Sequence, residues 1–102
     1  MIKVKIKKVN DKIYELVIKG HANYDEAGKD IVCAAVSKMA ITTVNACLSL
    51  EETITYEENS GLLIIRTLKD TDINQKLLRN LEDMLKELTN QYPKNIEIRN
   101  ED

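Results

Sequence analysis

Ile2-Lys-Val-Lys-Ile-Lys-Lys-Val9 opens the chain with an alternation of apolar side chains and lysines. A period of two is the pattern of a strand with one buried face, so residues 2–9 predict a half-buried strand. Asn10-Asp11-Lys12 is a turn sequence, and residues 13–19 repeat the alternation with Tyr14, Leu16 and Ile18 on one face. We expect the two strands to pair as a hairpin.

A long segment without periodicity follows, and then a helix. Residues 20–29 hold two of the three glycines, Gly20 and Gly28, near the ends of the segment. Asp30 is a favourable N-cap, so we expect a helix from there to about Leu50. Its first stretch, residues 31–36, is apolar around the whole circumference, which predicts burial on more than one side. A subunit partner is the expected source of the second cover.

Three further strands are predicted in the second half of the chain. Residues 53–58 and 62–67 are rich in β-branched and apolar residues, and Asn59-Ser60-Gly61 forms a turn between them. Residues 95–99 form a short last strand. All of these segments have the length that is usual for strands.

A second helix is predicted from about Ile73 to Tyr92. Asp72 with Gln75 gives a start signal of the capping-box kind, and Pro93 ends the helix. The apolar residues follow a period of 3.6 at Ile73, Leu77, Leu81, Met84, Leu85, Leu88 and Tyr92.

The element order is therefore β-β-α-β-β-α-β. This order predicts an α+β sandwich in which two helices pack on a mixed sheet. The 102 residues are enough for one domain and leave no room for a second, so residues 1–102 form a single domain.

The composition excludes several classes of site. One histidine and two cysteines exclude a three-His or four-Cys metal site and a multi-disulfide scaffold, so we expect neither metal nor cofactor. A net charge of −2 argues against a dedicated nucleic-acid binder. The N-terminus lacks the apolar run of a signal peptide, and the longest unbroken apolar stretch is residues 31–36. We therefore expect no membrane span, and a cytoplasmic protein with reduced thiols.

Cys33 is the first candidate for chemistry. With Asp30 as the cap, Cys33 is the third helical residue, near free backbone N–H groups and the positive end of the helix dipole, which favour the reactive thiolate. The alternative is inert packing, because free cysteines often behave as small apolar residues. Cys47 lies 14 positions later, ~21 Å along the helix, so we expect it to be core and unable to pair with Cys33.

The only histidine, His21, is the second candidate, although a lone histidine is also common in surface loops. Asp30 has two possible roles: capping the helix, or orienting His21 or a substrate group. Ser37 lies one turn after Cys33 and either donates to the thiolate or substrate, or back-bonds to the Cys33 carbonyl. Tyr24, in the loop, is either a substrate contact or a loop anchor.

Two motifs resemble those of a known family. Gly20-His21-Ala22 and Gly28-Lys-Asp-Ile-Val-Cys-Ala-Ala-Val-Ser37, with Val44-Asn-Ala46 further along, closely resemble the signature of the ribosomal-processing cysteine protease family, Prp. The similarity in element order and length extends over essentially the whole chain. Ala35 and residues 38–43 depart from the commoner small-residue pattern, which affects packing rather than chemistry.

The resemblance implies a cytoplasmic bacterial endopeptidase that is a homodimer. Such proteases remove the N-terminal extension from large-subunit ribosomal protein 27, after an apolar segment that ends in aromatic residues. It implies Cys33 as nucleophile and His21 as general base and acid, with Gly20, Asp30 and Ser37 at the family's other site positions. Whether a third group orients His21 is left open by the sequence, which offers Asp30 and Asp25 for that role. Segment 20–29 is then expected to order over a docked substrate.

Two other functions fit the residues. A non-catalytic, ribosome-associated binding module would keep the fold without using Cys33 or His21. A thiol redox sensor built on Cys33 would need no histidine.

Overall fold

The computed structural model describes residues 1–20 and 27–101, with residues 27–30 described by their backbone alone. Its elements follow the predicted order: β1 (Ile2–Val9), β2 (Lys12–Lys19), α1 (Ala27–Leu50), β3 (Ile54–Asn59), β4 (Leu62–Thr67), α2 (Asp72–Gln91) and β5 (Ile96–Glu101). The predicted fold class is therefore confirmed. Half of the strand boundaries coincide with the expected ones, and the others differ by one or two residues.

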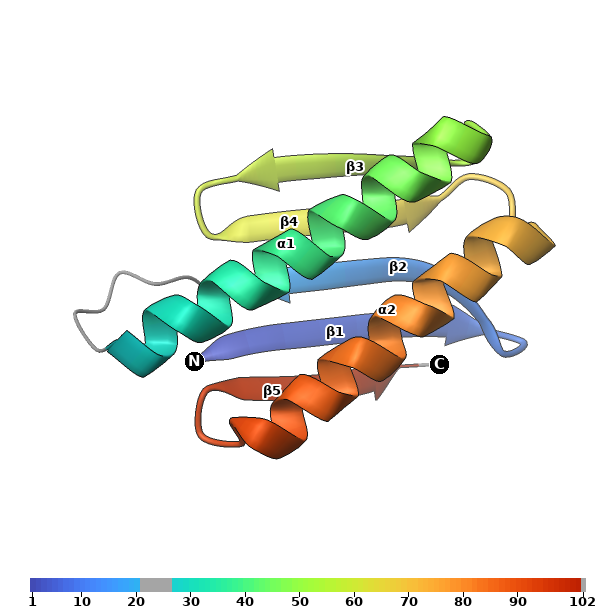
Figure 1. The fold of residues 1–102 in the computed structure, drawn as a ribbon. Helices are drawn as coiled ribbons and strands as arrows, with labels where there is room; N and C mark the ends of the chain where they lie inside the picture. The colour runs from blue at the N-terminus through green and yellow to red at the C-terminus, as the bar shows by residue number, and fades with distance from the viewer. Residues whose placement is uncertain (21–26, 102) are drawn as a thin grey trace.

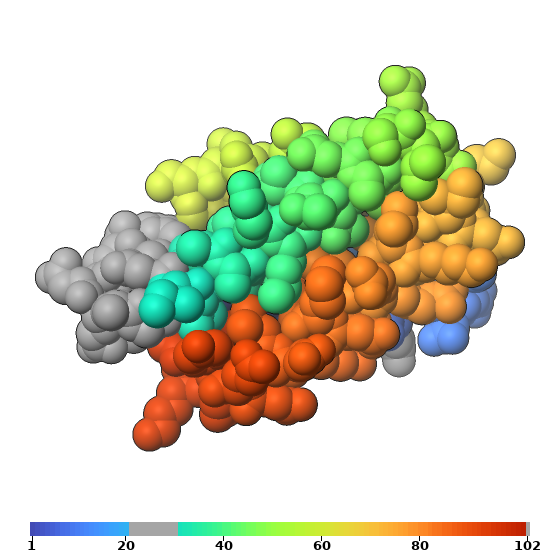
Figure 2. Space-filling model, viewed as in Figure 1, coloured from blue at the N-terminus to red at the C-terminus, as the bar shows by residue number. Residues whose placement is uncertain are grey.

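The five strands form one mixed sheet in the order β3-β4-β2-β1-β5. β1 pairs in parallel with β5, and the other neighbours are antiparallel. Both helices cover the same face of the sheet (Figure 1). They run side by side across that face (Figure 2), so the core lies in a single layer between helices and sheet.

The hairpin of β1 and β2 contains a bulge that the alternation did not predict. Asn10 and Asp11 both have positive φ, as a two-residue hairpin turn requires, and Lys12 already belongs to β2. The register shifts between Lys7 and Lys8, which pair with Glu15 and Ile13, so Tyr14 is the extra residue. Ile13 rather than Tyr14 therefore lies in the core with Leu16 and Ile18.

Gln75 of helix α2 stabilises the backbone beside this bulge. Its Oε1 accepts from the Ile13 N–H at 2.8 Å, and its Nε2 donates to the Ile13 carbonyl at 2.9 Å. Gln75 was expected to take part in the start of α2, but it is fully buried. The cap is Thr71, whose Oγ1 accepts from the Asn74 N–H, while Asn74 Oδ1 accepts from the Thr71 N–H, both at 3.1 Å.

Helix α1 packs on the sheet through one stripe of small and β-branched residues. Val32, Val36, Ala40 and Val44 recur every four positions and are buried, and Cys47 continues the stripe. The opposite side is open, and 60% of Ile31 is exposed. Within the described residues of this single chain, α1 is thus covered on one side, and the expected partner on the other side stays a prediction.

The start of α1 differs from the prediction. The helix begins at Ala27, so Asp30 is its fourth residue and not its N-cap. Acidic residues are favoured throughout the first turn as well as at the cap, because both lie at the positive end of the helix dipole. An aspartate at position 30 therefore could not show whether it was the N-cap or a residue of the first turn.

One stretch of α1, Ile31–Leu50, has the length and mean hydropathy (1.7) of a membrane-crossing helix. A core helix of a globular domain has the same composition, because its buried face must be apolar. Here that face supplies the stripe that covers the sheet. In the single chain 33% of this stretch is buried, so packing on the sheet accounts for part of its apolar character.

We expect Gln75→Leu to destabilise the domain. Loss of the side-chain amide leaves the Ile13 N–H and carbonyl with fewer partners in the core, which destabilises by about 1–3 kcal/mol per unpaired group. Urea unfolding at a fixed protein concentration measures the change, with Lys76→Leu, on the exposed neighbour, as control. A free energy of unfolding within about 0.5 kcal/mol of wild type, the range of ordinary surface changes, would contradict the role assigned to Gln75.

Candidate active site

A cavity of about 370 Å³ opens where the amino-terminal half of α1 passes over one end of the sheet. Three segments line it: α1, the end of β2, and the hairpin between β3 and β4. The lining residues are Ile18, Gly20, Cys33, Ser37, Glu58, Asn59, Ser60, Gly61, Leu62 and Leu63. Of the residues predicted for the site, the cavity thus brings together Gly20, Cys33 and Ser37.

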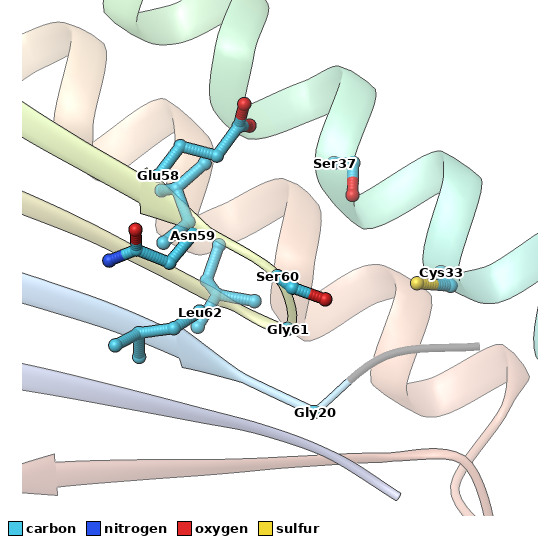
Figure 3. Close-up of a pocket in the computed structure, with 10 residues that line it drawn as sticks. Gly20, Cys33, Ser37, Glu58, Asn59, Ser60, Gly61 and Leu62 are labelled. Carbon is cyan, nitrogen blue, oxygen red and sulfur yellow. The ribbon is translucent and has the colours of Figure 1, made fainter. Parts of the chain in front are cut away.

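Cys33 presents its thiol to this cavity (Figure 3). The residue follows the buried Val32, so it lies at the border of the buried stripe and is half-buried rather than enclosed. Cys33 forms no disulfide in this chain. Its exposure to a cavity distinguishes it from an inert core cysteine.

Cys33 lies further into helix α1 than the sequence predicted. Because α1 begins at Ala27, Cys33 is the seventh helical residue and not the third. The free N–H groups of a helix belong to its first turn, here residues 27–30. The backbone N–H of Cys33 is therefore engaged within the helix and is not available as an oxyanion donor in this structure.

Ser37 lies one turn after Cys33, on the same side of α1 and in the same cavity (Figure 3). Its side chain is exposed. Among the hydrogen bonds between described residues, Ser37 makes no back bond to the Cys33 carbonyl, whereas Thr43 does make one to the Met39 carbonyl at 2.8 Å. No described residue therefore occupies the Ser37 hydroxyl, contrary to the simpler expectation of back-bonding, and the hydroxyl faces the cavity.

Gly20 fixes the point at which the chain leaves the sheet. Its φ is +102°, and a Cβ there would lie 2.6 Å from the Met1 carbonyl oxygen. Its N–H donates to the Gly61 carbonyl at 2.9 Å, so the end of β2 is tied to the β3–β4 turn. The left-handed backbone and the close approach both require glycine at this position.

Several predicted site residues fall outside the described part of the chain. His21 and Tyr24 lie in the segment 21–26, as does Asp25, the alternative partner of His21. Asp30 is placed by its backbone alone, in the first turn of α1. Within the described residues no group of three or more His, Cys, Asp or Glu side chains is arranged to hold a metal ion.

The β3–β4 hairpin is the part of the cavity that sequence reasoning missed. The turn at residues 59–61 was expected, but its place beside Cys33 depends on β4 pairing with β2. That pairing sets Leu62 opposite Lys19 and so brings the turn to the end of β2. Only the strand order, which local patterns do not determine, could have revealed this.

Cys47 has the properties of a core residue, as predicted. Its exposed fraction is 0%. Burial raises the pKa of its thiol, and the nearby charge of Glu51 raises that pKa further. The Cys47 thiol is therefore held in its unreactive, protonated form.

Comparison with known proteins gives a consistent family. The sequence profile described as "Cysteine protease Prp" matches residues 1–97. The ribosomal processing cysteine protease Prp of Staphylococcus aureus is 35% identical over 96 residues, which cover 88% of this chain and 91% of that protein. The Bacillus subtilis protein of the same name is 41% identical over 51 residues, or 49% of this chain and 46% of that one.

Solved structures agree with the sequence comparison. The essential ribosomal processing protease Prp from S. aureus, in complex with a substrate peptide, superposes with a TM-score of 0.92 at 28% identity, covering 99% of this chain and 100% of that one. A second structure of that protease, with a covalently linked product peptide, superposes with a TM-score of 0.86 at 31% identity over the same shares. The chain therefore belongs to the cysteine protease Prp family and is a cysteine protease.

Proposed function

We propose that this chain removes the N-terminal extension of large-subunit ribosomal protein 27, with Cys33 as nucleophile and His21 as general base and acid. The observation that carries the proposal is the half-buried Cys33 thiol, which opens into a cavity of about 370 Å³. Cys47, the other thiol, is sealed in the core. Only Cys33 can reach a peptide bond in the folded domain.

The reaction follows the chemistry of a thiol–imidazole pair. His21 takes the proton from the Cys33 thiol, and the thiolate attacks the carbonyl carbon of the scissile bond. The same imidazole gives its proton to the leaving amine, which departs and leaves a thioester on Cys33. Water, deprotonated by His21, then hydrolyses the thioester and regenerates the thiol.

The walls of the cavity suit an apolar substrate segment. Ile18, Leu62 and Leu63 contribute apolar surface at the sheet side of the cavity. Apolar contacts of this kind bind a peptide with little sequence specificity, and a few polar groups then set its register. Ser37 and the turn residues Asn59 and Ser60 supply such groups. Tyr24, Asp25 and Asp30 remain candidates for substrate contact and for orienting His21.

The homodimer and the cytoplasmic location are part of the same proposal. Exposed apolar side chains support a homodimer, since 60% of Ile31, 62% of Leu50 and 66% of Leu68 are accessible in the single chain. The two free cysteines support a reducing compartment. No nucleic acid, metal or cofactor is required by the proposed reaction.

Cys33→Ala and His21→Ala should each lower the rate of precursor cleavage by more than about 1000-fold, because each removes a group that the reaction uses directly. The measurement is mass spectrometry of ribosomal protein 27 precursor after incubation with each variant. Cys47→Ala is the matched control and should cleave at close to the wild-type rate while folded. A non-catalytic module predicts no cleavage by folded wild type, and a redox sensor predicts no effect of His21→Ala on thiol oxidation.

The two cysteines should differ in reactivity. Iodoacetamide is expected to alkylate Cys33 in the folded protein, and Cys47 about tenfold or more slowly, because the raised pKa of Cys47 leaves little thiolate. Intact mass should show one added group under native conditions and two in denaturing urea. Equal rates at both positions would contradict the buried placement of Cys47.

The raised pKa of Cys47 also predicts a pH dependence of stability. As pH rises, the thiol ionises first in the unfolded chain, so the unfolded state loses its proton first and the folded state is destabilised. Alkaline unfolding should therefore set in at lower pH for wild type than for Cys47→Ala. The same onset in both proteins would contradict the assignment.

Light scattering on the purified protein should give twice the chain mass of 11.7 kDa. Exposed apolar side chains gain free energy when a second copy covers them, by about 25 cal/mol for each Å² of apolar surface. Leu50→Lys with Leu68→Lys should shift the mass towards the monomer, whereas Lys38→Ala should not. A monomeric mass for wild type at micromolar concentration would contradict the homodimer.

A further inference from the structure

We infer that Glu58 determines specificity by binding a cationic side chain of the substrate, away from the bond that is cleaved at Cys33. The inference rests on the proposed function and extends it to substrate selection. Glu58 lies in the edge strand β3 and lines the same cavity as Cys33.

The register of the sheet turns Glu58 toward the helices. Glu58 pairs with Leu63, and Leu63 pairs with Ile18, so the three residues share one face. Leu63 and Ile18 are buried on the side that carries the core. Glu58 continues this row at the edge of the sheet, where its side chain is exposed, so its carboxylate is accessible to a molecule in the cavity that it lines.

The charge of Glu58 is uncompensated within the part of the protein that the structure describes. Among the described residues that line the cavity Glu58 is the only charged one, and no ion pair between described residues involves it. Its neighbour Glu57 faces the opposite side of the sheet and pairs with Arg66 at 3.4 Å. The two adjacent carboxylates thus differ in face and in partner, which makes Glu57 a control for Glu58.

The position of Glu58 sets the part of the substrate that it can reach. Figure 3 shows the Glu58 side chain extending toward α1, with Ser37 between it and Cys33. One helical turn separates Cys33 from Ser37, or about 6 Å along the axis. An extended peptide advances about 3.3 Å per residue. The substrate side chain that contacts Glu58 therefore belongs to a residue at least about two positions from the scissile bond.

The neighbouring walls favour a long cationic side chain over a free ion. Leu62 and Leu63 offer apolar surface for the methylene groups of a lysine or arginine, while Glu58 meets the charged end. An acidic side chain at the same position would be repelled. The cavity is therefore expected to discriminate among substrates by charge at one position.

The test uses peptides that span the cleavage site of the ribosomal protein 27 precursor. At each of positions two to four on either side of the scissile bond, lysine, norleucine and glutamate are compared by their kcat/KM. At one of these positions the wild-type protein should prefer lysine to norleucine by about two- to fivefold, the range of exposed ion pairs. The preference should shrink as salt is raised.

Three variants assign that preference to Glu58. Glu58→Gln should abolish it, Glu58→Lys should reverse it in favour of the glutamate peptide, and Glu57→Gln should leave it unchanged. Circular dichroism confirms that each variant is folded. If the lysine preference persists in Glu58→Gln, or if wild type shows no such preference, the inference about Glu58 is overturned while the proposed function still stands. Failure of folded wild type to cleave any peptide would overturn the proposed function, and this inference with it.

Discussion

The packing of helix α1 on the sheet is the constraint on which the candidate site depends. Val32 and Val36 are buried one turn apart, so the helix can rotate very little without exposing apolar surface. Cys33 and Ser37 each follow one of these valines and are therefore turned to the border of the buried stripe. The same packing that stabilises the core thus aims the thiol and the hydroxyl into the cavity.

A second constraint joins the rest of the site to this helix. The hydrogen bond from Gly20 to Gly61 ties the end of β2 to the β3–β4 turn. The backbone of Gly20 also approaches Met1 too closely for any side chain. The residue before His21 and the hairpin that carries Glu58 are consequently held in one rigid unit, which is the preorganisation that a catalytic cavity requires.

Local patterns predicted the elements well and the boundaries less well. The alternation of residues 2–9 and the 3.6 period of the second helix are properties of a few consecutive residues, so both elements were found. The start of α1 was missed because acidic residues suit both a cap and a first turn. The bulge at Tyr14 was missed because it is stabilised by Gln75, a residue 62 positions away from Ile13 in the chain.

The candidate site could be predicted only in part, because some of its residues are neighbours in the sequence and others are brought together by the sheet. Cys33 and Ser37 lie one turn apart on one helix, a relation that the sequence contains directly. Glu58 and Ser60 come to the cavity only through the pairing of β4 with β2, which is a long-range property of the sheet. Glu58 is exposed on an edge strand, and only the strand order shows that it lies in the same cavity as Cys33.

The central claim is that the fold presents Cys33, and not Cys47, to a bound peptide. A peptide chloromethyl ketone that ends at the proposed cleavage position forms a stable thioether with an attacking thiolate, and peptide mapping by mass spectrometry locates the adduct. The account predicts one adduct per chain, on Cys33, formed much more slowly by His21→Ala. An adduct on Cys47, or none on the folded wild-type protein, would contradict it.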